Sequence, residues 1–317
     1  MNTAPEVSFV IPVFKKANVL PEVLRALRDQ QIFEPVEYIF VDDASPDDSV
    51  AILKRLSNQF DNFQIIENET NAGPSVRLNQ GVRAARGRYL CLIDADELIV
   101  PNAVATMLRL LKAENAQIIH GKVAHSDLPA TDIHPAPMPQ QPEYLVSDSP
   151  LSLVANGRGF VRMTWLVQAD IFRKSGGCDE AVFVQDESFA LRIASYANRM
   201  IDLRAKMTYA PRIGSHISSN QAQLLHDRFL AHYNMLRDNP ALNADIQRAL
   251  SRKCISSAWK AVNRAGLPFN RWTLLALYGC TKLGLPLSTR RILDRLHDAF
   301  GQMTNVRRVP QPVNNKA

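Results

Sequence analysis

The sequence has few cysteines, and none of them is placed to act with another. The four are far apart and form no CxxC pair: Cys91, Cys178, Cys254 and Cys280. This spacing argues against a disulfide framework or a zinc site and suits a reducing cytoplasm.

Long apolar runs are also missing. No stretch reaches the roughly 18 uncharged apolar residues of a membrane-spanning helix. The first residues, MNTAPEVSFVIPVF, contain no basic segment and no long apolar segment, so we expect no signal peptide. With 317 residues, 46% of them hydrophobic, the chain can form one large domain or one domain with an appendage.

Glycine is absent from the turn after the first apolar run, IPVFKKAN at 11–18. A dinucleotide-binding dehydrogenase needs G-x-G-x-x-G there. A sugar nucleotidyltransferase usually has a Gly-rich, basic loop at the same place. The sequence therefore disfavours both classes.

Basic charge is concentrated at the C-terminal end. Residues 251–317 contain twelve Lys and Arg against two acids, a net charge of +10, whereas the rest of the chain carries −4. This asymmetry suggests that the tail meets an anionic surface. No nucleic-acid-binding motif accompanies it, so we expect no nucleic-acid partner. The tail's basic residues alternate with apolar helical faces, which favours an anionic membrane, although such faces could equally pack on the rest of the protein for residues 221–265.

The first 120 residues alternate between β-rich apolar runs and helical patterns. Strands are predicted at 7–14, 37–43, 63–69 and 88–96, and helices at 18–30, 45–59, 74–87 and 102–115. Asn18 and Ser45 are candidate helix N-caps. Apolar strands alternating with helices predict an α/β fold with a mostly parallel sheet flanked by helices.

Acidic residues follow two of these strands, Asp42 with Asp43 and Asp94 with Asp96. A parallel sheet binds ligands at the carboxyl ends of its strands. Two like charges at a strand end repel and lose hydration, and a hard cation such as Mg²⁺ or Mn²⁺ relieves both costs. A D-x-D at a strand end therefore suits a metal–diphosphate site.

The second half of the chain is less regular. Residues 125–150 are rich in proline and predict a long loop. The stretch QDESFALR predicts a helix with Asp186 at its start, where a carboxylate could simply favour the helix dipole. From about residue 221 the pattern is helical throughout.

Three stretches occur in the order and spacing of one known family: VSFVIPVFKKANVLPEVLRAL, EYIFVDDASPDDS and NETNAGPSVRLNQGVRAARGRYLCLIDADE. Together they resemble the inverting family 2 glycosyltransferases, densely over 5–125 and more loosely over 155–220. The resemblance implies a GT-A fold over 1–220, with a nucleotide-sugar half (1–124) and an acceptor half (125–220), followed by a basic helical region at 221–317.

The resemblance also implies site residues. Asp186 becomes the candidate general base, with Arg192 supporting it. Asp94 and Asp96 become metal ligands, and His216 in PRIGSHISSN is a further candidate ligand. The remaining candidates bind the nucleotide sugar: Pro12, Val13, Phe14, Asp42, Asp43, Arg77, Asn79, Asp94, Ala95 and Arg192. Glu97 stands where relatives frequently have Asp, Gln185 replaces their usual acid, and Arg77 lies one place earlier than the Arg often found directly before Asn79.

The implied reaction is a single inverting displacement. A metal, Mn²⁺ or Mg²⁺, neutralises the diphosphate leaving group while a carboxylate removes the proton of the acceptor hydroxyl. The expected partners are a nucleotide-sugar donor, with UDP the first choice, and a glycan or lipid-linked acceptor in cell-surface polysaccharide or lipopolysaccharide synthesis. The expected location is the inner face of the cytoplasmic membrane. A catalytically inactive sugar-nucleotide-binding subunit is the alternative, and intact Asp94, Asp96 and Asp186 argue against it.

Overall fold

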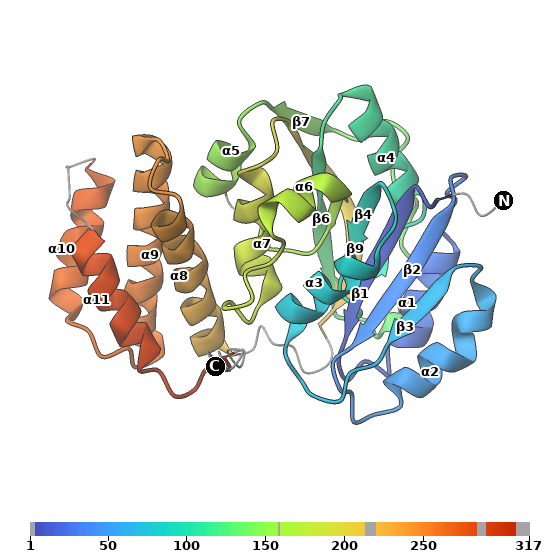
Figure 1. The fold of residues 1–317 in the computed structure, drawn as a ribbon, viewed down its shortest axis with the longest axis horizontal. Helices are drawn as coiled ribbons and strands as arrows, with labels where there is room; N and C mark the ends of the chain where they lie inside the picture. Colours follow the sequence, from blue (N-terminus) through green and yellow to red (C-terminus); the bar gives the residue numbers. More distant parts are fainter. Residues whose placement is uncertain (1–3, 158, 213–219, 284–289, 309–317) are drawn as a thin grey trace, which may run out of the picture.

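A computed structural model describes residues 4–157, 159–212, 220–283 and 290–308. A twisted sheet lies between two helical layers, and a helical bundle extends from one end (Figure 1). The strands are β1 Val7–Val13, β2 Val36–Asp42, β3 Phe63–Ile66, β4 Tyr89–Leu92, β5 Leu98–Ile99, β6 Ile118–Ser126, β7 Tyr144–Ser147, β8 Trp165–Gln168 and β9 Met200–Pro211. The α-helices are α1 Leu20–Arg28, α2 Ser49–Leu56, α3 Pro74–Ala84, α4 Ala103–Ala113, α5 Pro150–Asn156, α6 Ala169–Ser175, α7 Gln185–Ala194, α8 Gln221–Asp238, α9 Ala244–Arg264, α10 Arg271–Lys282 and α11 Arg290–Gly301.

The strands form one sheet in the order β3-β2-β1-β4-β8-β6-β9-β5, with β7 paired to β9. The pairs β3-β2, β2-β1 and β1-β4 are parallel, as the alternating pattern predicts. β8 runs antiparallel to both β4 and β6, and β6 is parallel to β9. The carboxyl ends of β1, β2, β4, β6 and β9 therefore lie at one edge of a mostly parallel sheet.

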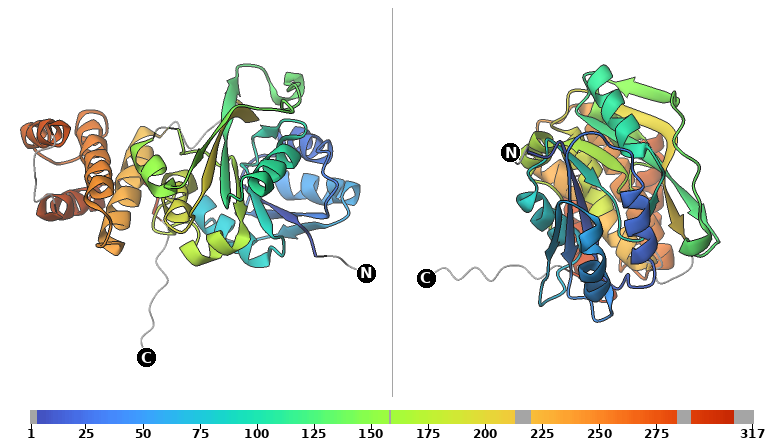
Figure 2. Two further views of the ribbon diagram at one scale, coloured as in Figure 1. Left: turned by 90° about the horizontal axis from the view of Figure 1, so that it is seen from above. Right: turned by 90° about the vertical axis from the view of Figure 1, so that its right-hand side faces the viewer.

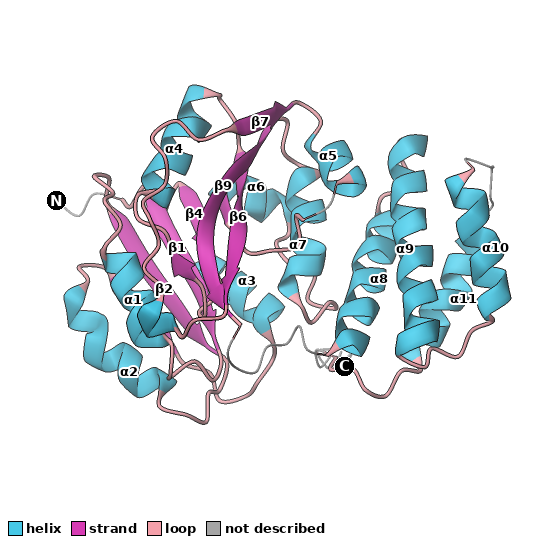
Figure 3. Ribbon diagram, turned by 180° about the vertical axis from the view of Figure 1, so that it is seen from behind, coloured by secondary structure: helices cyan, strands magenta, loops and turns pink. Residues whose placement is uncertain are grey.

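The two faces of the sheet are covered by different helices. On β1, Val7, Phe9, Ile11 and Val13 pack in a core with α1 and α4, whereas Val10 packs with α3, α6 and α7 on the other side. Figure 3 shows α1, α2 and α4 on the first face, and Figure 1 shows α3, α6 and α7 on the second. This strict alternation is the period-2 pattern of a strand buried on both sides.

The predicted elements are all found, but several boundaries are wrong. Helix α1 begins at Leu20 after Val19, and α2 begins at Ser49 after Asp48, so neither Asn18 nor Ser45 is an N-cap. β4 ends at Leu92 instead of continuing to Asp96. The expected loop at 125–150 includes the last residues of β6 and all of β7, because the edge of β9 offers β7 a backbone partner.

The region after residue 220 is helical where it is described, as predicted. α8 and α9 pack on the sheet and its helices, since Met235, Ile246, Ala249 and Leu250 belong to the same core as β1, α3 and α7. α10 and α11 pack on α8 and α9 around Phe229 and Phe300, which stack at 4.3 Å between ring centroids. Figure 2 shows this bundle projecting from one end of the molecule. Among the described residues, no helix is long and apolar enough to cross a membrane.

Candidate active site

The acidic residues predicted from the strand ends lie at one edge of the sheet. Val13 pairs with Asp42 across β1 and β2, and Val10 pairs with Leu92 across β1 and β4. Asp94 follows Leu92 by two residues, directly after the end of β4. The two acid pairs are thus brought to the same edge, with β1 between them.

Asp94 and Asp96 do not project from a strand as the sequence suggested. They lie in a turn, where the Glu97 backbone N–H donates to the Asp94 carbonyl oxygen (3.1 Å). β5 then leads back into the sheet against β9, and the Thr208 hydroxyl donates to Glu97 (2.5 Å). Asp94 and Asp96 therefore belong to the turn, while the side chain of Glu97, just before β5, is held by the hydroxyl of Thr208 in β9.

Helix α7 brings a fourth carboxylate, Asp186, to this turn. The Gln185 amide donates to Asp94 Oδ1 (2.8 Å), which ties the first residue of α7 to the turn. Burial raises the pKa of Asp94, and the neighbouring Asp186 and Asp96 charges raise it further. A Glu at 185 would add another negative charge at this point, whereas Gln185 supplies a donor.

Asp186 is half-buried, but its Oδ1 is buried and has no hydrogen-bond partner. Burial raises the pKa of Asp186 to about 7, against the opposing effect of Arg162 and with a further increase from Glu97. A carboxylate with this pKa and a free oxygen can accept a proton near neutral pH.

Two cations face the carboxylates, and neither was among the site residues predicted from the sequence. Lys16, directly after β1, forms an ion pair with Asp96. The exposed Arg162, just before β8, opposes the rise in the pKa of Asp94 and Asp186. The basic pair KK after the first strand was a visible signal, whereas Arg162 lies in an aperiodic segment that gave none.

The cluster fits a divalent cation in its donor chemistry. Four carboxylates, Asp94, Asp96, Glu97 and Asp186, face two cations, so negative charge is in excess, and carboxylate oxygen is what Mg²⁺ and Mn²⁺ prefer. Within the described residues, no group of three or more His, Cys, Asp or Glu is already arranged around a metal position. His216 lies outside the described residues.

At the other side of β1, Asp42 and Asp43 are both buried but differ in their contacts. Asp43 accepts from the backbone N–H of Ala72 (2.7 Å) and Gly73 (2.9 Å) and from Arg77 Nε (2.7 Å). Asp42 accepts from the Ser45 N–H (3.0 Å) with one oxygen, and its other oxygen, Oδ1, is buried without a partner. Asp42 can therefore accept a further hydrogen bond, while Asp43 holds the loop before α3.

The two candidate residues on α3, Arg77 and Asn79, form hydrogen bonds to other parts of the protein. Arg77 donates to Asp43, Asn68 and the Thr70 carbonyl oxygen, so its guanidinium is engaged within the protein. Asn79 donates to the Cys178 carbonyl oxygen (3.0 Å) and accepts from the Cys178 N–H (2.9 Å). Both side chains are buried.

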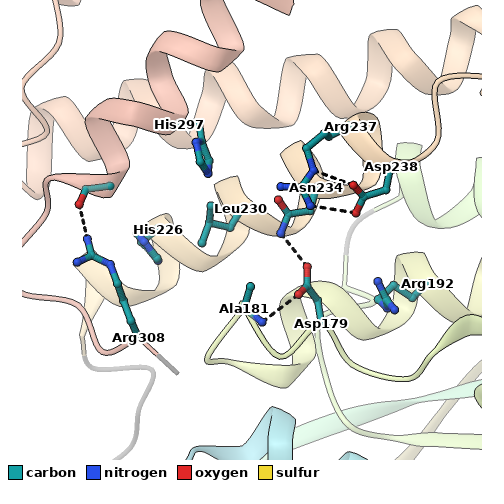
Figure 4. Close-up of a pocket in the computed structure, with 11 residues that line it drawn as sticks. Asp179, Ala181, Arg192, His226, Leu230, Asn234, Arg237, Asp238, His297 and Arg308 are labelled. Carbon is teal, nitrogen blue, oxygen red and sulfur yellow. Dashed lines mark hydrogen bonds and ion pairs between the residues drawn. The ribbon is translucent and has the colours of Figure 1, made fainter. Parts of the chain in front are cut away.

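Arg192 of α7 forms hydrogen bonds to the backbone of the loop between α6 and α7, which also contains Cys178. Its Nε donates to the Gly177 carbonyl oxygen (2.6 Å) and its Nη2 to that of Ser175 (2.9 Å). Gly177 has a positive φ of 68°, and a Cβ there would lie 2.3 Å from Asn79 Oδ1. Arg192 also lines a pocket of about 400 Å³ between this loop, α8 and α11 (Figure 4). Neither Asp94, Asp96 nor Asp186 lines that pocket.

Residues 8–175 match a protein family described as glycosyl transferase family 2. A stretch of 120 residues is 32% identical to the poly(ribitol-phosphate) beta-glucosyltransferase of Bacillus spizizenii, covering 37% of this chain and 19% of that protein. The chain matches only part of its curated relatives, namely 19% of the length of this glucosyltransferase and 63% of the length of a glycosyltransferase from Haemophilus influenzae.

Two solved structures share the fold over nearly the whole chain. S. aureus TarS in complex with UDP-GlcNAc has a TM-score of 0.64 at 18% identity, covering 96% of this chain and 82% of that one. The mannosyltransferase PcManGT of Pyrobaculum calidifontis, in complex with GDP-Man and Mn²⁺, has a TM-score of 0.57 at 15% identity, covering 94% and 86%. The GT-A fold expected from the sequence, with C-terminal helices, is thereby confirmed.

Proposed function

The chain belongs to glycosyl transferase family 2 and is a glycosyltransferase, and we propose that it moves a sugar from a nucleotide-diphosphate donor to a hydroxyl of a cell-surface glycan or lipid-linked glycan, with inversion. The observation that carries the proposal is Asp186. Its buried oxygen has no partner and lies beside the Asp94–Asp96 turn, where a donor diphosphate and an acceptor hydroxyl can meet.

In this proposal, the edge around β1 holds the nucleotide. Pro12, Val13 and Phe14 form the floor for the base, and the unpartnered Oδ1 of Asp42 accepts a donor group from the base edge. A UDP-sugar is our first choice, because a uracil ring carries one such N–H. Asp43, Arg77 and Asn79 contribute by holding the loops around this floor.

Asp94, Asp96 and the Ala95 backbone face the ribose and diphosphate in this assignment. Asp94 and Asp96 would hold Mn²⁺ or Mg²⁺, which supplies positive charge to the leaving diphosphate. Lys16 and Arg162 add two further cations beside the same phosphates. The PcManGT complex contains Mn²⁺, which supports a metal here, and His216 as a further ligand stays a prediction.

Asp186 takes the proton of the acceptor hydroxyl as the bond from that oxygen to the anomeric carbon forms. The bond from the anomeric carbon to the diphosphate breaks, and the nucleoside diphosphate leaves with the electron pair. Because one displacement occurs, the anomeric configuration inverts. No covalent intermediate with the protein is required, so no nucleophilic Ser or Cys takes part.

The test combines a donor panel with a substitution. UDP-, GDP-, CMP- and dTDP-sugars are titrated with Mn²⁺ or Mg²⁺ against the wild type, Asp96→Asn and the exposed control Asp61→Asn. We expect metal-dependent binding of one donor class by the wild type and the control. Asp96→Asn should bind that donor about tenfold or more weakly, since one charged ligand is lost, about 1.4 kcal/mol. Donor binding that is unaffected by EDTA, or unchanged in Asp96→Asn, contradicts the metal assignment.

We further propose that the bundle docks at the inner face of the cytoplasmic membrane. Trp272 and Leu275 on α10 and Leu283 directly after it are 67%, 44% and 77% exposed, and their spacing places them on one side of the helix. Leu274 and Leu277 on the same helix face the core instead. Arg271 and Lys282 lie at the two ends of α10, and α11 of the same bundle carries three further arginines, Arg290, Arg291 and Arg295. An apolar stripe with basic flanks matches an anionic bilayer surface, where a lipid-linked acceptor lies.

A further inference from the structure

The backbone on either side of Asp186 is held by a different part of the chain. Helix α8, which follows the catalytic part, presents two adjacent charged residues to the start of α7. Asp227 Oδ2 accepts from the Val184 backbone N–H (2.8 Å). Arg228 forms two hydrogen bonds with Glu187, from Nη2 to Oε1 (2.6 Å) and from Nε to Oε2 (3.0 Å). Asp186 therefore lies between two residues that α8 fixes.

Asp227 is completely buried, which is costly for a carboxylate unless its oxygens are hydrogen-bonded. Gln223 Nε2 lies 3.0 Å from both of its oxygens, and His226 Nδ1 lies 2.7 Å from Oδ1. Gln223 is in turn bound to the backbone of Arg307, with contacts of 3.1 and 2.6 Å. The carboxylate that holds Val184 is thus fixed by α8 and by the segment after α11.

The pair of Arg228 and Glu187 is also well defined. Glu187 is 4% exposed, and its hydrogen bonds with Arg228 raise the pKa of Arg228 against the opposing effect of burial. The two parallel N–H···O bonds set both the distance and the orientation of Glu187. A third contact of α8 is formed by Asn234, whose Nδ2 donates to Asp179 Oδ2 in the loop before α7 (2.8 Å; Figure 4). We call these contacts of α8 with α7 and the residues before it the seam between α7 and α8.

We propose that Asp227 and Arg228 are positioning residues for Asp186. They touch neither donor nor acceptor in this proposal. They hold Val184 and Glu187, and through them the direction in which the free oxygen of Asp186 points. No hydrogen bond to Oδ1 holds the Asp186 carboxylate in place, so the orientation of this carboxylate depends on the position of the Asp186 backbone. The inference rests on the role of Asp186 given under the proposed function.

The test separates positioning from simple support of the fold. Arg228→Lys keeps the charge but loses the two-bond geometry, Arg228→Gln loses both, and Asp227→Asn keeps the size. The matched control is Arg237→Gln on the same helix, whose pair with Asp238 is about half exposed. Each variant is assayed for donor affinity, single-turnover transfer and thermal unfolding.

We expect donor affinity within about twofold of the wild type and transfer slowed by about 10²-fold in Arg228→Gln and Asp227→Asn, because small misplacements of a catalytic group have effects of this size. Arg228→Lys should fall between, and Arg237→Gln should match the wild type. The double variant Glu187→Gln/Arg228→Gln should recover part of the rate, since two neutral side chains can still hydrogen-bond.

Two results overturn the inference. One is transfer at the wild-type rate in Arg228→Gln or Arg228→Lys with only the melting temperature lowered. The other is a parallel loss of donor affinity and transfer in Arg228→Lys, which indicates general loosening. If Asp227→Asn does not fold, the Arg228 series decides alone. Asp186→Asn is run beside them: transfer at the wild-type rate in that variant contradicts the proposed function itself, whereas its failure with an unaffected Arg228 series contradicts only the positioning role.

Discussion

Asp186 is held in an environment that makes its ionised form costly, and this has consequences for both rate and stability. Burial raises its pKa to about 7, with Arg162 opposing and Glu97 adding to the increase. At neutral pH about half of the molecules then carry the proton there. A base with this pKa removes a proton effectively and is still available in its ionised form.

The rate of transfer should therefore follow the ionisation of Asp186. In single-turnover experiments we expect the wild-type rate to rise about tenfold per pH unit below about 7 and to level off above it. Asp186→Asn should be slower by about 10²–10⁴-fold and lose this dependence, while donor affinity is retained. A wild-type profile that is flat between pH 5.5 and 8.5 contradicts the assignment of Asp186 as the base.

The same residue should lower stability at alkaline pH. Its folded-state pKa, about 7, lies above the ordinary value of 3.8, so the folded protein binds an extra proton between these values. The stabilisation is fully present below about pH 4 and is lost as the pH rises through 7. Asp186→Asn should thus melt about 2–4 °C above the wild type at pH 8, and the difference should shrink toward pH 5. Equal melting temperatures at pH 8, with Asp61→Asn as control, contradict this.

Single residues of the site were predictable in proportion to how regular their surroundings are. Asp94 and Asp96 follow a strand, so the hydrophobic pattern located them, whereas Asp186 was assigned from the resemblance to family 2 glycosyltransferases. Lys16 and Arg162 lie in irregular segments, and only the folded chain shows which charges they face. For Arg77 and Asn79 the sequence gave the position but not the contacts, because hydrogen bonds to Asp43 and to Cys178 join segments about 34 and 99 residues apart.

Among the structural elements, the loop between α6 and α7 is held by side chains from other elements. Arg192 and Asn79 hold Ser175, Gly177 and Cys178, and the loop then leads into α7. Arg192→Ala should lower the free energy of unfolding by about 1–3 kcal/mol, because two carbonyl groups lose a charged donor. Denaturant unfolding measures this loss. Lys174→Ala, which removes an exposed pair with Asp170, is the control and should change it by at most about 1 kcal/mol.

Elements with a complete apolar period were predictable, and their ends were not. β1 and β2 lie within one residue of the predicted ranges, since continuous apolar runs leave little choice. β4 stops at Leu92 although apolar residues continue to Ile93, because the turn at Asp94 redirects the chain to pair with β9. β7 was hidden in a proline-rich segment, and its pairing with β9 is a long-range contact that local sequence does not encode.

At the scale of the whole molecule, the helical region after residue 220 is divided between two roles. α8 and α9 share a core with the catalytic part, whereas α10 and α11 form the outer end of the bundle (Figure 2). The exposed apolar stripe is on α10, so the surface proposed to meet the membrane is the part of the bundle that packs least on the catalytic part.

The stripe can be tested without removing any helix. A variant with Trp272→Gln, Leu275→Gln and Leu283→Gln should bind vesicles of mixed phosphatidylglycerol and phosphatidylcholine about tenfold more weakly than the wild type, since burying even one such side chain is worth about 1.5 kcal/mol. Phe33→Gln, at a 99% exposed position in the catalytic part, is the matched control. High salt should weaken binding of the wild type.

Three outcomes contradict membrane docking by the stripe: no binding by the wild type, equal binding by the triple variant, or binding that is the same on vesicles of phosphatidylcholine alone. Light scattering on both proteins adds a fourth. If the wild type is a dimer and the triple variant a monomer, the stripe is a contact between two copies.

The seam between α7 and α8 also bears on how new transferases can arise by recombination. A crossover placed at residue 220 would pair the α7 of one parent with the α8 of another, and the partners of Val184 and Glu187 would then come from an unrelated sequence. A crossover after Arg264 keeps these contacts, together with those of α5 and α9, within one parent. Exchange of helices among relatives should therefore be tolerated better at α10 and beyond than at residue 220, with only the contact of Gln223 to the Arg307 backbone exchanged in this network, while α8 and α9 are inherited with the catalytic half.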